Sequence, residues 1–360
     1  MSTYSDMVNV KNTIKLREML EKMPPFCADY FRGISNSTST NTRVGYCRNI
    51  RTFFQFIVDR NPLYKDKTID VLSIDILEEI TPLDIDEYME YLDFYVLNGT
   101  EYRNSTSAKA RNLSAVSNMY QFFNKRKLIT NNPMNSVERP KVHDKVIISL
   151  DQEQIFELME VIENPEKMTE RQKKIHEFTV DRDRAIITVM LGTGIRVSEL
   201  VGLDVSDIDF NNYSLRVLRK GGNEDFVFFG DTVAEALYYY LYAESSEDLI
   251  LEKSPREILL KDEKSEEKAL FISMKGQRMA VRSVQAMVNR YQELLNINKK
   301  ITPHKLRSTF GTTLYRETGD IYLVADVLGH KDVNTTKAHY AAQSNQNRKR
   351  AADIVNLKKG

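Results

Sequence analysis

The sequence contains few cysteines and no long apolar segment. Cys27 and Cys47 are its only cysteines in 360 residues, too few for a disulfide framework or a cysteine-built zinc site, so a reducing cytoplasm is expected. No apolar run reaches the roughly 20 residues of a membrane span. The first residues, MSTYSDMVNVKN, lack the layout of a signal peptide. At 41% hydrophobic and 28% charged, the chain is expected to be globular and long enough for two domains.

Net charge is also absent, since 51 basic residues balance 51 acidic residues. Taken alone, this balance argues against a dedicated nucleic-acid-binding protein. The charges are segregated, however: residues 59–100 and 244–268 are acidic, whereas residues 101–145, 275–307 and 331–360 are basic. A solvated face explains any single charged block. Three basic blocks in a neutral chain favour positive stripes that follow a phosphate backbone.

The apolar spacing predicts helices in the first 140 residues. One helix follows the cap pair Asn41–Thr42, a second begins near Pro82 and ends at Asn98–Gly99, and a third follows 105–107. Their inward positions are predicted to be Cys47, Ile50, Phe54, Ile57, Val58, Tyr88, Met89, Tyr91, Leu92, Tyr95, Leu113, Val116, Tyr120 and Phe123. We interpret the aromatic residues among them as core residues, not as a base-stacking platform.

Helix-breaking and extended residues from Asn131 to Lys141 predict a linker. We expect a helical domain at 1–140, a linker at 141–149 and a second domain at 150–360. The second domain contains the only clear strand pattern, at 208–210, 214–219 and 225–229, with a tight turn at Gly221–Gly222. Helices are expected around these strands, so the fold class is mainly α with a small antiparallel β-sheet. The acidic stretch 244–268 is expected to be an insertion or long loop.

Four patches of the second domain carry residue types suited to chemistry. In the first, Arg196 and Glu199 share a helix face, so the carboxylate can orient the guanidinium. The others are a lysine before a Gly-Gly turn, a His-x-x-Arg pair, and a Leu-Gly-His motif with a tyrosine ten residues later (Lys220; His304 and Arg307; His330 and Tyr340). Each alone has an ordinary explanation, such as a surface ion pair or a packed side chain. Their occurrence together in one domain points to a functional site.

With these motifs the chain resembles the tyrosine recombinases, also called the phage-integrase family. The matched pattern is Gly-x-Arg-x-x-Glu-Leu at 194–200, Lys-Gly-Gly at 220–222, His-x-x-Arg at 304–307 and Leu-Gly-His at 328–330, followed by Tyr340. The resemblance implies two domains, a helical core-binding domain and a tyrosine-recombinase catalytic domain. The layout is closest to the simple Xer-type members without an arm-binding domain, because only about 40 residues precede the first strongly patterned helix.

The resemblance implies that Tyr340 is the nucleophile, which attacks the scissile phosphorus and leaves a 3′-phosphotyrosine and a free 5′-hydroxyl. A phenol has a pKa near 10, so it needs a cationic pocket or a base, and it leaves readily in the reverse step. Arg196 and Arg307 would clamp the non-bridging oxygens and stabilise the transition state. The adduct conserves the bond energy, so we expect neither ATP, metal nor any other cofactor.

The resemblance also assigns the supporting roles. Lys220 would protonate the departing 5′-oxygen, His304 would assist as acid or base near the nucleophile, and His330 would donate to the phosphate. Glu199 would orient the arginine of its own helix.

The implied partner is double-stranded DNA, bound by a homotetramer on two DNA sites. The helix expected at 347–355 would dock on a neighbouring subunit, so the C-terminal tails would be exchanged. The candidate DNA-contacting residues are Arg43, Arg48, Arg51, Lys109, Arg111, Arg139, Lys141, Arg278 and Arg282.

Three alternatives remain. A type IB topoisomerase shares the tyrosine chemistry and would relax a plasmid that has no recombination site. A catalytically silent DNA-binding regulator would be unaffected by Tyr340→Phe. A metal-dependent hydrolase using His304, His330 and His339 would be inhibited by chelators, but no His-Glu-x-x-His motif accompanies these histidines.

Overall fold

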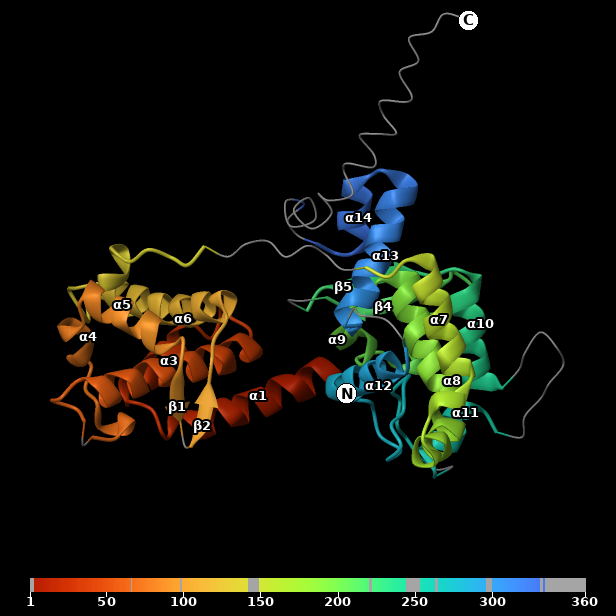
Figure 1. The fold of residues 1–360 in the computed structure, drawn as a ribbon, viewed down its shortest axis with the longest axis horizontal. Helices are drawn as coiled ribbons and strands as arrows, with labels where there is room; N and C mark the ends of the chain where they lie inside the picture. Colours follow the sequence, from red (N-terminus) through yellow and green to blue (C-terminus); the bar gives the residue numbers. More distant parts are fainter. Residues whose placement is uncertain are drawn as a thin grey trace, which may run out of the picture. The chain divides into compact units, whose positions relative to one another are not determined.

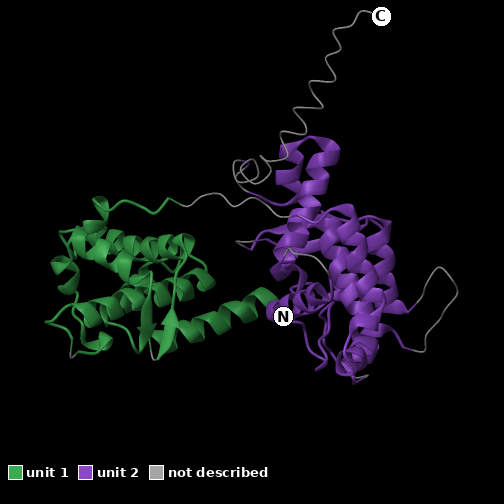
Figure 2. Ribbon diagram, in the orientation of Figure 1, with its two compact units in different colours: residues 1–143 green, residues 144–360 purple. Residues whose placement is uncertain are grey.

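The computed structural model divides into two compact units, residues 1–143 and 144–360 (Figure 2). The residues it describes are 3–65, 67–97, 99–141, 149–219, 222–243, 253–262, 265–295, 300–330 and 333. Lys220, Tyr340 and the tail helix expected at 347–355 lie outside these ranges. The division between the units falls within the segment 141–149, and each unit is described by itself.

Unit 1 is helical with one small hairpin (Figure 1). Its elements are α1 (Tyr4–Leu20), α2 (Phe26–Gly33), α3 (Thr40–Arg60), η1 (Ile69–Val71), α4 (Ile76–Glu79), α5 (Pro82–Tyr91), β1 (Tyr95–Leu97), β2 (Thr100–Tyr102), α6 (Thr106–Lys125) and η2 (Pro133–Asn135).

The core of unit 1 is centred on α3 and α6, which pack against each other. Most of the predicted inward positions are buried: Cys47, Ile50, Phe54, Ile57, Val58, Tyr88, Tyr91, Leu92, Leu113, Val116, Tyr120 and Phe123. The core interpretation of these aromatics is therefore confirmed. Burial raises the pKa of the Cys47 thiol to about 12, so this cysteine stays a protonated packing residue at neutral pH.

Two parts of unit 1 differ from the sequence expectation. The N-terminal helices α1 and α2 precede the first helix that the pattern predicted, and α1 was inconspicuous because Leu16 is its only buried residue. The helix predicted from Pro82 to Asn98–Gly99 ends at Tyr91, and an antiparallel hairpin follows it. Gly99 has φ +74°, the left-handed conformation that a tight hairpin turn requires.

Unit 2 combines a bundle of helices with a three-stranded sheet, whose strands β4 and β5 are labelled in Figure 1. Its elements are α7 (Gln152–Glu163), η3 (Pro165–Lys167), α8 (Glu170–Thr193), α9 (Val197–Leu200), η4 (Val205–Asp207), β3 (Ile208–Asp209), β4 (Ser214–Leu218), β5 (Glu224–Phe228), α10 (Asp231–Tyr242), α11 (Pro255–Leu260), α12 (Val281–Leu294), α13 (Pro303–Thr318) and α14 (Ile321–Val327).

Helix α8 is the long central element of unit 2 and packs against α7, α10, α11 and α13. The strands pair antiparallel in the order β3-β4-β5, with Leu215 opposite Val227. The predicted fold class, mainly α with a small antiparallel β-sheet, is confirmed. Within the stretch 244–268, residues 255–260 form helix α11. Among the described residues, no helix combines the length and the apolar character of a membrane span.

Candidate active site

The site begins at the carboxyl end of α8, where Gly194 turns the chain out of the helix. Gly194 has φ +64° and caps α8 in the left-handed conformation. A Cβ at this position would lie 2.4 Å from the Phe310 ring and 2.8 Å from Leu328. Only glycine meets both demands, and the turn places Arg196 at the N-cap of α9.

Arg196 forms the predicted pair with Glu199. Its Nη1 donates to Glu199 Oε1 at 2.7 Å, and its backbone N–H donates to Glu199 Oε2 at 3.0 Å. The carboxylate is buried, whereas the Arg196 side chain is 33% exposed. The pair therefore presents an oriented guanidinium to the surface, where an anionic ligand can reach it.

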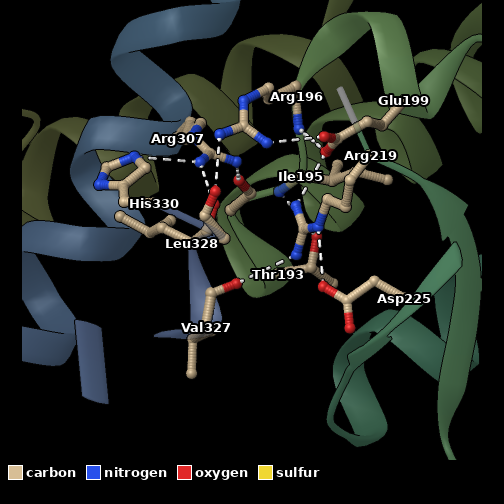
Figure 3. Close-up of polar contacts among 12 residues, drawn as sticks. Thr193, Ile195, Arg196, Glu199, Arg219, Asp225, Arg307, Val327, Leu328 and His330 are labelled. Carbon is tan, nitrogen blue, oxygen red and sulfur yellow. Dashed lines mark hydrogen bonds and ion pairs between the residues drawn. The ribbon is translucent and has the colours of Figure 1, made fainter. Parts of the chain in front are cut away.

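Arg307 reaches the same place from α13. It is buried, and its Nη1 donates to the Gly194 carbonyl oxygen at 2.6 Å. Its Nη2 donates to the Leu328 carbonyl oxygen and lies 3.2 Å from Nε2 of His330. Arg307 thus links the end of α8 to the end of α14 (Figure 3).

The carboxyl end of α14 binds three arginines through three consecutive carbonyls. The oxygens of Val327, Leu328 and Gly329 accept hydrogen bonds from Arg219 at 3.4 Å, from Arg307, and from Arg196 at 3.2 Å (Figure 3). The last carbonyls of a helix lack partners within it and carry its partial negative charge. Cations from three distant segments are therefore held side by side.

The turn after α14 makes this arrangement possible. Gly329 has φ +59°, and the backbone N–H of His330 donates to the Ala325 carbonyl oxygen at 2.9 Å. This pattern ends the helix and directs His330 back toward Arg307. The Leu-Gly-His motif therefore supplies a helix end as well as a histidine.

Arg219 is the site residue that the sequence reasoning missed. Its side chain is 11% exposed and forms ion pairs with Glu199 at 3.1 Å and Asp225 at 2.9 Å. The available signal was a second cation directly before Lys220, at the base of the predicted hairpin.

The predicted site residues Arg196, Glu199, Arg307 and His330 are thus brought together. His304 is exposed on the first turn of α13, one turn before Arg307, and Lys220 and Tyr340 lie outside the described residues. The described part of the chain contains no group of three or more His, Cys, Asp or Glu residues arranged to hold a metal ion.

The charges of the cluster favour an anion. Three guanidinium groups converge here: Arg196 and Arg219 pair with the carboxylates of Glu199 and Asp225, and Arg307 binds backbone carbonyl oxygens. The excess positive charge is fixed in place by helix-end carbonyls, so it needs little reorganisation when an oxyanion binds.

Five of the candidate DNA-contacting residues lie on α3 and α6. The two helices adjoin at their basic faces, because Asn49 Nδ2 donates to the Arg111 carbonyl oxygen at 3.3 Å. Arg48 and Arg111 are exposed, and Arg43 and Arg51 are half-buried. Lys109 is less accessible, with an 18% exposed side chain that binds Asp93 at 2.7 Å.

The remaining candidates differ in their surroundings. Arg139, Lys141 and Arg282 are exposed. Arg278, by contrast, donates to the carbonyl oxygens of Val201 at 3.0 Å and Leu203 at 2.9 Å, and it also pairs with Asp204. Its side chain is 13% exposed, so it stabilises unit 2, and its expected DNA contact stays a prediction.

Comparison with known proteins identifies a family for this chain. Residues 149–347 match the phage integrase family. Tyrosine recombinase XerC of Caldanaerobacter subterraneus subsp. tengcongensis is 29% identical over 347 residues, which cover 93% of this chain and 89% of that protein. Tyrosine recombinase XerS of Lactococcus lactis subsp. cremoris is 27% identical over 371 residues, covering 96% and 98%.

Among solved structures, XerH site-specific recombinase bound to palindromic difH substrate has a TM-score of 0.58 and 18% identity, covering 83% of this chain and 76% of that chain. This likeness shows the fold. Because the family match spans more than half of the chain, the protein belongs to the phage integrase family, the tyrosine recombinases that cut and rejoin DNA at specific sites.

Proposed function

We propose that this recombinase cleaves double-stranded DNA with Tyr340 as the nucleophile and Arg196 and Arg307 as the phosphate clamp. The observation that carries the proposal is the pair of arginines held on the adjacent carbonyls of Leu328 and Gly329. The two guanidiniums come from α9 and α13, yet they share one anchor. Two oriented guanidiniums on one anchor suit the two non-bridging oxygens of a phosphodiester.

The chemistry is a transfer of one ester to another. The Tyr340 oxygen bonds to phosphorus, the bond to the 5′-oxygen breaks, and Lys220 gives that oxygen its proton. His304 serves as acid or base near the phenol, and His330, beside Arg307, donates to the phosphate. The 3′-phosphotyrosine retains the energy of the broken bond, so a free 5′-hydroxyl can reverse the step without ATP. We propose no cofactor for this reaction.

We propose that both units contact DNA. Exposed Arg48 and Arg111 on the adjoining faces of α3 and α6 would bind phosphates of the backbone. Unit 1 would then be the core-binding domain, residues 1–140, and residues 150–360 the catalytic domain. The relative XerH is named as bound to its palindromic difH substrate, which supports duplex DNA as the partner. The working complex would be a homotetramer on two sites, with exchange of the 347–355 tail helix, in the cytoplasm.

The test is a trapped covalent adduct. DNA that stays attached to the wild-type protein after detergent treatment is sequenced, and the recovered site is rebuilt as a duplex nicked beside the cleavage position. Loss of the short 5′-hydroxyl fragment prevents religation, so wild type should accumulate a detergent-stable protein–DNA adduct, and Tyr340→Phe should form none.

Tyr315→Phe is the matched control, because Tyr315 is another C-terminal tyrosine, on α13, and it should form the adduct normally. An adduct that persists in Tyr340→Phe would refute the choice of nucleophile. A wild-type protein that forms no adduct with any recovered DNA would refute the proposed reaction.

A further inference from the structure

Arg219 connects three separate parts of the candidate site. Its Nη1 binds Glu199 Oε2 at 3.1 Å, its Nε binds Asp225 Oδ2 at 2.9 Å, and its Nη2 donates to the Val327 carbonyl oxygen at 3.4 Å. These partners belong to α9, β5 and α14. One mostly buried guanidinium therefore fixes the spacing between the elements that carry the phosphate clamp.

The contact with Glu199 bears on Arg196. Glu199 is buried, and its two carboxylate oxygens accept from different donors. Oε1 accepts from the Arg196 guanidinium, and Oε2 accepts from Arg219 and from the Arg196 backbone N–H. Without Arg219, a buried carboxylate would keep its full charge with one cation beside it. That imbalance would draw Arg196 toward Glu199 and away from the surface, where it would meet a phosphate.

The contact with α14 bears on Arg307 and His330. A Cβ at Gly329 would lie 2.9 Å from both Cζ and Nε of Arg219, so the turn after α14 lies directly against this guanidinium. The same turn carries the Leu328 carbonyl, which accepts from Arg307. Arg219 therefore supports the anchor that the clamp residues share.

The backbone of Arg219 adds a fourth link. Its N–H donates to the Asn223 carbonyl oxygen at 2.8 Å, and its carbonyl accepts from Gly222 at 3.0 Å. Arg219 thus closes the base of the Lys-Gly-Gly turn, and Lys220 is the next residue in the sequence.

We propose that Arg219 is a positioning residue of the recombination site, which orients Arg196 through Glu199 and holds the end of α14 that anchors Arg307. The inference rests on the proposed function, since the reaction whose rate it affects is DNA cleavage. It assigns Arg219 no contact with the substrate.

The test separates the rate of cleavage from DNA binding. On the nicked duplex described above, at saturating protein, Arg219→Ala should form the covalent adduct about 10- to 100-fold more slowly, the size expected when reacting groups shift by about 1 Å. The dissociation constant for the same duplex should change less than about 3-fold, because DNA affinity comes mainly from many phosphate contacts elsewhere.

Arg216→Ala is the matched control. Arg216 lies on β4, three residues before Arg219, and also has two ion-pair partners, Asp207 at 2.7 Å and Glu224 at 3.4 Å, but its side chain is 46% exposed. This variant should cleave at the wild-type rate. The rate losses of Arg219→Ala and Glu199→Gln should not multiply in the double variant, since one residue acts through the other.

If Arg219→Ala does not fold, Arg219→Lys provides the test, because an ammonium keeps the charge but has one nitrogen, whereas the three partners of Arg219 bind three separate nitrogens. We expect a slower rate at a normal unfolding temperature. A wild-type cleavage rate in a folded Arg219→Ala would overturn the proposal, and so would a wild-type rate in Arg219→Lys if Arg219→Ala does not fold. Rate losses that multiply with those of Glu199→Gln would also overturn it. An inactive wild-type protein would instead contradict the proposed function.

Discussion

At the scale of single residues, the site depends on the ability of one guanidinium to donate hydrogen bonds to several partners through different nitrogens. Arg307 binds the Gly194 and Leu328 carbonyl oxygens through different nitrogens. A lysine at this position has a single nitrogen and cannot span both. Arg307 therefore supports the fold in addition to its proposed role as a clamp for phosphate.

Arg307→Lys should lose both functions. We expect the rate of adduct formation to fall on the order of 100- to 1,000-fold, as for removal of one preorganised donor. The free energy of unfolding should fall by about 1–3 kcal/mol, because a buried carbonyl loses its partner. Single-turnover cleavage and urea unfolding measure the two effects. Arg316→Lys, on the same helix beside Glu317, should change neither, and a wild-type rate in Arg307→Lys would contradict the clamp.

Two glycines permit a matched comparison of backbone strain and crowding. Gly319 and Gly329 both follow helices with positive φ, +67° and +59°, but a Cβ at Gly319 meets nothing within 4 Å, whereas at Gly329 it meets Arg219 at 2.9 Å. Gly319→Ala should cost about 1–2 kcal/mol from strain alone and leave cleavage unchanged. Gly329→Ala should cost more in urea unfolding and should also slow cleavage. Equal effects of the two substitutions would show that the contact with Arg219 is unimportant.

Residue types and spacing were sufficient to predict the contact of Arg196 with Glu199, and they singled out Arg307 and His330. They were insufficient for Arg219, because its Val327 partner lies 108 residues away along the chain. The hairpin pattern around Arg219 describes a strand end, and nothing local indicates which helix end covers it. Long-range burial decided the role of this residue.

At the scale of elements, α8 and α12 are joined by a buried polar cluster. The Asp183 carboxylate is fully buried and accepts from Arg182 at 2.6 Å, Arg290 at 2.6 Å and the Tyr291 hydroxyl at 3.0 Å. The same hydroxyl lies 3.3 Å from Nδ1 of His176, which is also buried. The helices of this contact are therefore fixed by charge as well as by apolar packing.

This cluster should make the stability of unit 2 sensitive to mild acid. Burial lowers the pKa of His176 from its usual value of 6.5. The charge of Arg290 also lowers this pKa, and the charge of Asp183 raises it, with a smaller effect than burial. The unfolded state therefore binds the proton more readily, so the free energy of unfolding should fall as the pH decreases from about 6.5. Thermal unfolding measured between pH 5 and pH 7 shows how the stability depends on pH. His176→Gln should reduce the slope in this window; an unchanged slope would mean that His176 does not titrate on unfolding.

The hairpin of unit 1 shows why one element was predicted wrongly. The sequence Asn98–Gly99 was interpreted as a helix stop, although the same pair also favours a hairpin turn. The hairpin is favoured by ring stacking. The ring of Tyr95 stacks on that of Tyr91, with a centroid distance of 5.1 Å and an interplanar angle of 17°, and on that of Tyr102, with 5.1 Å and 11°. This row of rings involves residues on both sides of the turn, so periodicity before the turn could not reveal it.

At the scale of the whole molecule, a neutral chain is proposed to bind a polyanion through local basic surfaces. DNA affinity should then fall steeply with salt. Arg48→Gln, on the exposed face of α3, should weaken binding and reduce the magnitude of the salt slope by about 1, the loss of one phosphate contact. Arg32→Gln is the control, because Arg32 is exposed in the same unit but pairs with Asp29. Fluorescence anisotropy over a salt series measures both, and identical slopes in all three proteins would remove Arg48 from the interface.

Chain length and the linker pattern from Asn131 to Lys141 were the basis for expecting two domains. The helical and strand periodicities were enough for the fold class, because most expected inward positions are buried. The convergence of α9, α13 and α14 was not predictable, since it depends on the packing of α13 along α8. Only the family motifs suggested that these segments meet.

The short helix α14 gives the site a cooperative character. Seven residues are too few for a helix to persist alone, and Val324 and Leu328 hold it through burial. Since Val327, the last residue of the helix, and the two residues that follow it each bind a different arginine through their carbonyl oxygens, fraying of this turn would release all three cations together. Inactivating lesions in a genetic screen are therefore expected at the buried side chains that hold α14, Val324 and Leu328, as often as at the arginines themselves.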